Sequence, residues 1–170
     1  GVLELHWVEG QTWQHLQDAL RQGPWHLFYF SGHGDYNPWI QEGEVAFADA
    51  HGLSAMLRAS KLARLMADHD VLRLVILNAC EGGRGSQQDI FSSTAAILVG
   101  QGVPAVLAMQ YEITDQAAVT FAEVFFKALT GGWPVDAAAT DARKAIYLAG
   151  NNTFEWGTPV LYMHAPDGLL

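Results

Sequence analysis

The sequence predicts an α/β domain built as a three-layer sandwich, with a mostly parallel central sheet and helices on both faces. Two short apolar runs, "LRLVIL" at 72–77 and "VPAVLAM" at 103–109, are typical of strands that are buried on both sides. Helical patterns lie between and after these runs, and that alternation favours a parallel sheet covered by helices. The 170 residues suffice for one domain, and no linker or internal repeat divides them.

The N-terminal part of the chain is expected to contain two strands, one helix and a small hairpin. Residues 2–8 alternate enough, with branched and aromatic side chains, to indicate a strand. Residues 11–21 place apolar side chains on one helix face, and a Gly-Pro pair ends that helix. Residues 26–31 form a second short apolar strand. The next stretch is irregular, except that 44–48 and 53–57 are expected to pair as a hairpin.

The rest of the chain predicts alternating helices and strands. Ser60 is expected to cap a helix that runs to about Asp68, and Thr114 to cap a long apolar helix with Phe121 and Phe125 facing inward. The expected helices cover 60–68, 89–99, 114–129 and a segment after Trp133-Pro134, and the expected strands cover 72–77, 103–109 and 159–163.

The charge balance excludes several classes of partner. The chain has nine Lys and Arg residues and eighteen Asp and Glu residues, so its net charge is -9. Such a surface repels phosphate backbones and anionic lipid, which argues against a nucleic-acid or membrane partner. No apolar stretch is long enough to span a bilayer, and no signal peptide opens the chain.

The single cysteine, Cys80, excludes an internal disulfide and a cysteine-rich zinc site, and it favours a reducing compartment, here the cytoplasm. His51 and His164 have no carboxylate or cysteine at ligand spacing, so no metal site is expected. The chain opens at Gly1 without a methionine, from which we expect a piece of a longer, multidomain protein.

Two reactive side chains lie just past the carboxyl ends of predicted strands. His33 stands between two glycines in "FYFSGHG", and Cys80 ends the stretch "LVILNAC". In parallel sheets, sites gather beyond the carboxyl ends of the strands, so neighbouring strands would bring both side chains into one cleft. An imidazole can take the proton of a thiol, whose unperturbed pKa is about 8.5, or protonate a leaving amine. Each residue alone is more often structural, but the two together at glycine-flanked strand ends favour a catalytic dyad.

Four motifs in order carry a resemblance to a known family. These are "FYFSGHG", "VILNACEGG", "GVPAVLAMQYEITDQAAVTFAEVFFKAL" and "GTPVLYMHAP". Together they resemble the CHAT family of caspase-like cysteine peptidase domains, which are bacterial and often fused to tetratricopeptide or other helical repeats. The resemblance extends from Val8 to Met163 and implies a caspase-like fold.

Carried onto this chain, the resemblance implies that Cys80 is the nucleophile and His33 its acid–base partner. The backbone N–H groups of Gly34 and Cys80 would form the oxyanion hole. Asn78 matches a position that lines the primary specificity pocket of caspase-like peptidases. Related enzymes have Gln or Asp at this position, so neither aspartate nor arginine specificity transfers.

Further pocket candidates lie beyond neighbouring strands. Asp115, Gln110 and Glu112 follow the strand at 103–109, where related peptidases supply another pocket wall. Asp115 could equally be an ordinary acidic residue in the first turn of a helix. Asp35 either orients the loop after His33 or lines the cleft. With Asp115 and Glu112 in the pocket, a basic residue before the scissile bond would be favoured.

The sequence thus predicts a cysteine endopeptidase that cuts a protein or peptide substrate in regulated proteolysis, of a bacterial cell-death or defence type. No organic cofactor is expected, and control would come from repeat or sensor domains on the same full-length chain. The alternative is a catalytically silent caspase-like domain that serves as an interaction or sensor module. A cysteine hydrolase or transferase with a non-peptide substrate is a third alternative.

Overall fold

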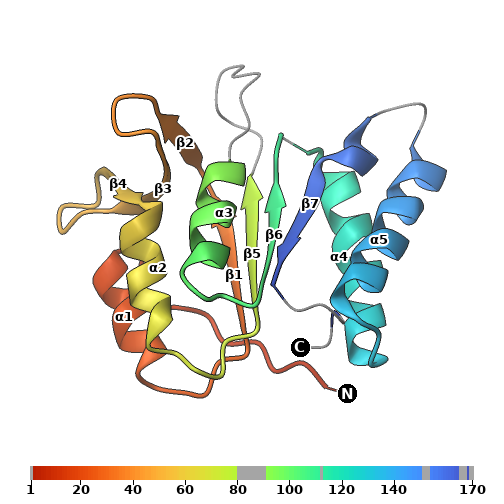
Figure 1. The fold of residues 1–170 in the computed structure, drawn as a ribbon, viewed down its shortest axis with the longest axis horizontal. Helices are drawn as coiled ribbons and strands as arrows, with labels where there is room; N and C mark the ends of the chain where they lie inside the picture. Colours follow the sequence, from red (N-terminus) through yellow and green to blue (C-terminus); the bar gives the residue numbers. More distant parts are fainter. Residues whose placement is uncertain (1, 80–90, 112, 151–153, 165–167, 169–170) are drawn as a thin grey trace.

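The computed structural model describes residues 2–79, 91–111, 113–150, 154–164 and 168, and it has the predicted α/β class. The central sheet has four strands in the order β1-β5-β6-β7 (Figure 1). Strands β1 (Leu27–Gly32), β5 (Leu74–Ala79) and β6 (Ala105–Met109) are parallel, and β7 (Pro159–Met163) runs antiparallel to β6. The prediction of a mostly parallel sheet is therefore confirmed.

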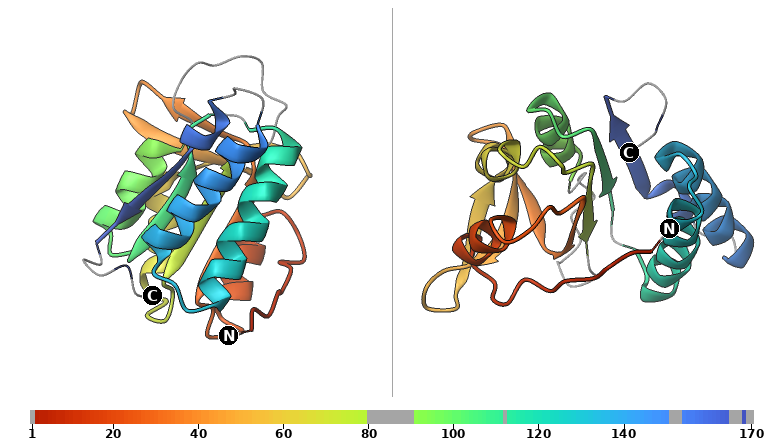
Figure 2. Two further views of the ribbon diagram at one scale, coloured as in Figure 1. Left: turned by 90° about the vertical axis from the view of Figure 1, so that its right-hand side faces the viewer. Right: turned by 90° about the horizontal axis from the view of Figure 1, so that it is seen from below.

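The centre of this sheet is the core of the molecule. All five residues of β6 are buried, and Leu74 to Leu77 of β5 are at most 2% exposed. Both strands are apolar throughout these stretches because helices cover both of their faces. Figure 2 shows α2 (Ala59–Ala67) and α3 (Ser92–Gly100) on one side of the sheet, and α4 (Asp115–Thr130) and α5 (Val135–Ala149) on the other. In the described part of the chain, no helix has the length and hydropathy needed to cross a bilayer.

A hydrogen bond from a half-buried arginine ties α5 to the edge of the sheet. The Nε atom of Arg143 donates to the carbonyl of Pro159 at 2.7 Å, and Nη2 of the same guanidinium also donates to this oxygen. Burial lowers the pKa of Arg143, because the charged form loses hydration. The bond to the first residue of β7 offsets part of that loss, since a charged donor makes a stronger hydrogen bond.

A second, antiparallel sheet of three strands stands beside the first. It contains β2 (Gly34–Asn37), β3 (Glu42–Ala48) and β4 (Ser54–Arg58) in that order. The predicted hairpin corresponds to β3 and β4 and is confirmed. Strand β2, with the sequence "GDYN", lies in the stretch that was expected to be irregular, because these four residues show no apolar alternation. Its extended conformation comes from its pairing with β3.

Two local expectations were wrong. Residues 2–8 belong to neither described sheet, and Leu5 and Trp7 are 72% and 83% exposed. Alternation forms a strand only where a neighbouring edge accepts it, and no described strand pairs with these residues. Ser60 does not cap its helix, because α2 begins one residue earlier at Ala59. The carboxylate of Glu42 in β3 instead accepts the Ser60 backbone N–H at 2.5 Å.

Helix α1 (Trp13–Leu20) and the cap of α4 agree with the sequence. The Thr12 side chain accepts the His15 backbone N–H at the start of α1, and Thr114 accepts the Ala117 N–H at 3.3 Å at the start of α4. The inward face of α4 includes Phe121 and Phe125, as expected from their spacing.

Candidate functional site at the carboxyl ends of the central strands

The register between β1 and β5 brings the ends of the two motif strands together. Ser31 pairs with Asn78, and Gly32 pairs with Ala79, in a parallel ladder. Paired residues of adjacent strands lie roughly 4.8 Å apart. His33 and Cys80 follow Gly32 and Ala79 in the chain, and these two strand residues are direct neighbours in the sheet. Cys80 itself lies outside the described residues.

His33 stands where the chain passes from one sheet to the other. It lies between the last residue of β1 and the first residue of β2, and its side chain is exposed. Its backbone carbonyl accepts the Ala46 N–H from β3 at 2.9 Å. This bond fixes the backbone at His33 while the imidazole stays accessible to solvent and to a ligand.

The N–H of Gly34 points away from β3. In an antiparallel pair, hydrogen-bonded and non-hydrogen-bonded positions alternate. The bond from Ala46 to His33 makes that position the hydrogen-bonded one, so the next pair, Gly34 with Val45, is not hydrogen-bonded. The Gly34 N–H is therefore directed to the outer edge of β2, which is the end strand of the small sheet.

Gly34 also meets a packing requirement that its sequence context did not reveal. A Cβ at this position would lie 2.1 Å from Cε1 of Phe91 and 2.8 Å from two further ring atoms. Phe91 is fully buried, and its ring meets Phe30 edge-on at 6.3 Å. In the structure, the aromatic ring of Phe91 occupies the place where a side chain at position 34 would lie.

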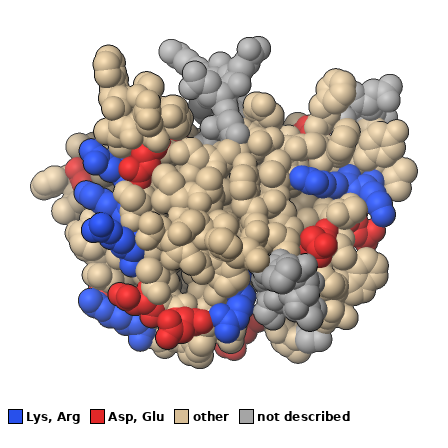
Figure 3. Space-filling view, viewed as in Figure 1, with Lys and Arg blue, Asp and Glu red and all other residues tan. Residues whose placement is uncertain are grey.

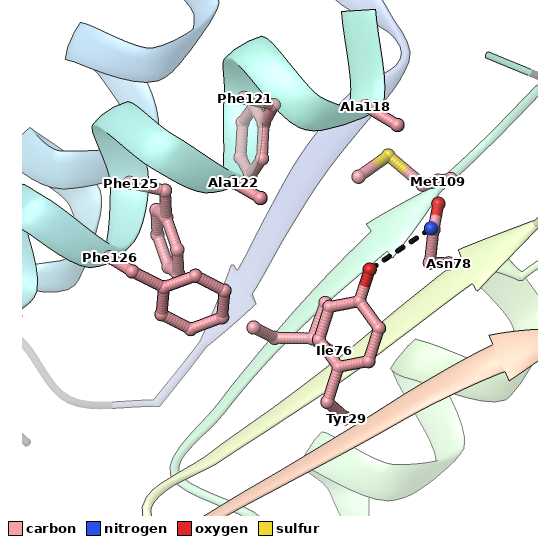
Figure 4. A pocket seen from close by; sticks show the side chains of 9 residues that line it. All are labelled: Tyr29, Ile76, Asn78, Met109, Ala118, Phe121, Ala122, Phe125 and Phe126. Carbon is pink, nitrogen blue, oxygen red and sulfur yellow. Dashed lines mark hydrogen bonds between the residues drawn. The ribbon is translucent and has the colours of Figure 1, made fainter. Parts of the chain in front are cut away.

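Asn78 is a buried polar residue with one unpaired atom. Its side chain is on the α4 side of the sheet, and Nδ2 donates to Tyr29 Oη at 3.0 Å (Figure 4). Its Oδ1 has no hydrogen-bond partner among the described residues. An unsatisfied buried acceptor costs about 1–3 kcal/mol, so stability alone does not favour this amide.

A small cavity separates Asn78 from α4. Met109 lines it from the sheet, and Ala118 and Phe121 line it from the helix (Figure 4). Its volume of about 10 Å³ is near the lower limit for one water molecule and well below the size of a substrate side chain.

Gln110 joins three elements just beyond β6. Its backbone N–H donates to the Thr158 carbonyl at 3.0 Å, and its Nε2 donates to Ser92 Oγ at 3.2 Å. Ser92 is the first residue of α3. Gln110 is thus hydrogen-bonded to the residue that precedes β7 and to the first residue of α3.

The remaining predicted pocket residues are acidic. Asp115 is exposed at the first position of α4, one turn before Ala118 and hence near the cavity beside Asn78. The carboxylate of Asp35 accepts the Tyr36 backbone N–H at 2.8 Å, a contact that fits a role in orienting its own segment. Glu112 lies outside the described residues.

Three of the predicted site residues lie at one edge of the central sheet. His33, Asn78 and Gln110 lie at the carboxyl ends of β1, β5 and β6, which are neighbours in the sheet. Sequence reasoning missed Tyr29 and Phe91, the contacts of Asn78 and Gly34. A parallel register that pairs position 29 with 76 would have suggested Tyr29, but nothing in the sequence indicates Phe91. Among the described residues, no three His, Cys, Asp or Glu side chains form a cluster that could hold a metal ion.

Comparison with known families gives one match. The family model described as "CHAT domain" matches residues 4–164, which is nearly the whole chain. No curated protein matches the sequence.

Proposed function

The chain belongs to the CHAT domain family, a caspase-like family, and from this premise we propose that it is a cysteine endopeptidase with Cys80 as nucleophile and His33 as acid–base partner. The observation that carries the proposal is the register that pairs Gly32 with Ala79. It supports a dyad because the residues that follow these two start from adjacent points of one sheet edge. The proposed architecture is the caspase-like three-layer sandwich.

The proposed reaction has two stages. The Cys80 thiolate attacks the peptide carbonyl carbon, a C–S bond forms, and the carbonyl electron pair moves to oxygen. The C–N bond then breaks, and the imidazolium of His33 gives its proton to the leaving amine. In the second stage His33 takes a proton from water, whose oxygen attacks the thioester carbonyl. The C–S bond breaks, and proton return regenerates the free enzyme and the carboxylic acid product.

The Gly34 N–H supports an oxyanion hole in this scheme. It points away from the β2–β3 ladder and lies one residue after His33, so the ladder does not use it. A backbone donor of this kind typically stabilises the transition state by about 2.7–4 kcal/mol. We assign the second donor to the N–H of Cys80. The exposed His33 side chain, next to this donor, would reach the leaving group of the same substrate.

Alkylation of the thiol tests the dyad without knowledge of the substrate. Iodoacetamide reacts with the thiolate and releases iodide, and Cys80 is the sole cysteine, so every adduct reports on this residue. Pairing with a protonated His33 would favour the thiolate of Cys80, and we expect alkylation at pH 7 about tenfold faster than that of free cysteine. His33→Ala should remove this advantage.

The matched control for the labelling experiment is His51→Ala. His51 is exposed in the β3–β4 turn, and its backbone N–H donates to the Asp49 carboxylate, so replacing its side chain should leave alkylation unchanged. Cys80 reactivity equal to free cysteine, together with no effect of His33→Ala, would contradict the dyad and favour a silent interaction domain.

We further propose that Asp115, with Glu112, gives a preference for a basic residue before the scissile bond. The proximity of Asp115 to the wall formed by Ala118 and Asn78 supports this assignment. A solvent-exposed ion pair contributes up to about 1 kcal/mol, so Asp115→Asn should reduce the preference for Lys and Arg about fivefold in a peptide-library cleavage assay.

Asp136→Asn is the control for the specificity experiment. Asp136 is likewise an exposed acidic residue in the first turn of a helix, α5, so both variants lose the same favourable interaction with a helix dipole. A library in which large apolar residues dominate before the cut would refute the assignment, and so would equal shifts from the two variants.

A further inference from the structure

A groove between α1 and α2 concentrates positive charge on an acidic protein. It encloses about 670 Å³, and its lining includes Arg21 from the end of α1 and Lys61 and Arg64 from α2. Lys61 and Arg64 are three residues apart on one helix and therefore share a face. Figure 3 shows Lys and Arg gathered on the left-hand side of the molecule, over α1 and α2. The whole chain has a net charge of -9, so the net positive charge of this lining contrasts with the charge of the chain as a whole.

These cations have few partners within the protein. Among the described residues, neither Lys61 nor Arg64 makes an ion pair. Arg21 pairs with Asp18 at 3.1 Å, but both side chains are more than 60% exposed, and an ion pair between such residues contributes little. Asp68 is the acidic residue in the lining. The positive charge of the groove is thus available to a ligand.

The groove also presents apolar surface between its charges. Trp13 is 40% exposed at the first position of α1, and the partly buried side chains of Leu57 and Leu65 lie in the same lining. Tryptophan and arginine are among the residue types that are enriched where the binding energy of protein interfaces concentrates. A ligand that matches this groove has both carboxylates and a large apolar side chain.

We propose that the α1–α2 groove docks an acidic, amphipathic segment of a partner protein, with Leu or aromatic side chains against Trp13 and Leu65 and carboxylates against Lys61 and Arg64. Charge complementarity selects this occupant. A nucleic acid carries charge along its entire backbone and would meet the acidic remainder of the surface, whereas a short peptide confines its charge to the groove. Helices α1 and α2 are eight and nine residues long, or about 12–14 Å, which matches a segment of about two helical turns.

This docking surface is separate from the proposed catalytic edge. In Figure 1, α1 and the C-terminal end of α2 lie beside the amino ends of the central strands, whereas His33 follows the carboxyl end of β1. A partner bound in the groove would therefore leave the strand ends open. The proposal is independent of peptidase activity and holds equally for a silent domain.

Fluorescence anisotropy with a labelled amphipathic peptide of about two helical turns, the length that the groove matches, tests the proposal. The peptide presents Glu on one face and Leu and Trp on the other. We expect it to bind the wild-type chain at least tenfold more tightly than either a version with Lys in place of Glu or a scrambled version. The double variant Lys61→Glu/Arg64→Glu should lose at least tenfold in affinity, and Trp13→Ala a similar amount.

The control is Lys144→Glu, the same charge change on an exposed residue of α5. It should alter affinity less than twofold, and circular dichroism should show all variants folded, since Lys61 and Arg64 are exposed. No binding to the wild type, equal binding of the scrambled peptide, an equal loss with Lys144→Glu, or tighter binding of a single-stranded oligonucleotide would each overturn the proposal.

Discussion

His33→Ala is expected to lower kcat for peptide hydrolysis by about 10²- to 10⁴-fold, the usual contribution of a positioned general acid–base group. In the proposed reaction the imidazole protonates the leaving amine and then activates water, so its loss slows both stages. KM should change little, because the exposed imidazole acts in the transition state and is not assigned to hold the substrate. The measurement is steady-state cleavage of a peptide selected from a library with the wild-type chain.

His51→Ala and Cys80→Ser are the two control variants for this measurement. His51→Ala should retain wild-type kcat, because its side chain lies in the exposed β3–β4 turn. Cys80→Ser should be at least as impaired as His33→Ala, since a hydroxyl is a far weaker nucleophile than a thiolate at neutral pH. Full activity in His33→Ala would remove this histidine from the mechanism, whatever the effect at Cys80.

Gly34→Ala is expected to lower the free energy of unfolding by about 1–3 kcal/mol or more, the typical cost of overpacking a core. The added methyl group would overlap the ring of Phe91, which is fully buried and also contacts Phe30. Since the Phe91 ring is fully buried and packs against Phe30, a shift of this ring would disturb the surrounding core. Chemical denaturation of the purified variant measures the change.

The matched control for Gly34 is Gly100→Ala. Gly100 is the last residue of α3, and a Cβ there would meet no atom within 4 Å. Alanine in a helix is more favourable than glycine by about 0.5–1 kcal/mol, so this variant should be as stable as the wild type or slightly more so.

A double-mutant cycle identifies the contact responsible. Phe91→Leu removes the ring that the new methyl group would strike, so the combined variant should be less destabilised than the sum of Gly34→Ala and Phe91→Leu. Equal stability of the Gly34→Ala and Gly100→Ala variants would show that the close approach of Phe91 does not constrain Gly34.

Much of the fold could be predicted from local patterns. The apolar runs of β5 and β6 identify strands that are buried on both faces. The spacing of Phe121 and Phe125 identifies a helix with one buried face, because burial of a face requires apolar residues at regular intervals in the sequence. Residues 2–8 show where such patterns mislead: their alternation resembles that of an edge strand, yet no described strand pairs with them. Strand β2 shows the converse, since "GDYN" is extended only because β3 holds it.

The candidate site was predicted in outline only. Glycine-flanked His33 and Cys80 at strand ends suggested the dyad, and the register of β1 with β5 is consistent with it. Asn78 was expected to face a specificity pocket, and the structure adds its bond to Tyr29, its unpaired oxygen and a cavity too small for a side chain. The roles of Asp115, Gln110, Glu112 and Asp35 in substrate binding stay predictions.

By itself, the sequence determined the α/β class, the chemistry of the proposed dyad and the acidic net charge, because these depend on residue types and on neighbours along the chain. Only the tertiary structure decided that Phe91 fills the space beside Gly34, that Tyr29 contacts Asn78, and that three cations meet Trp13 in one groove. The contacts of Gly34 with Phe91 and of Tyr29 with Asn78, and the placing of Lys61 and Arg64 beside Trp13, join residues more than forty positions apart. Local propensity acts over a few residues, whereas strand register and helix packing select which distant side chains meet.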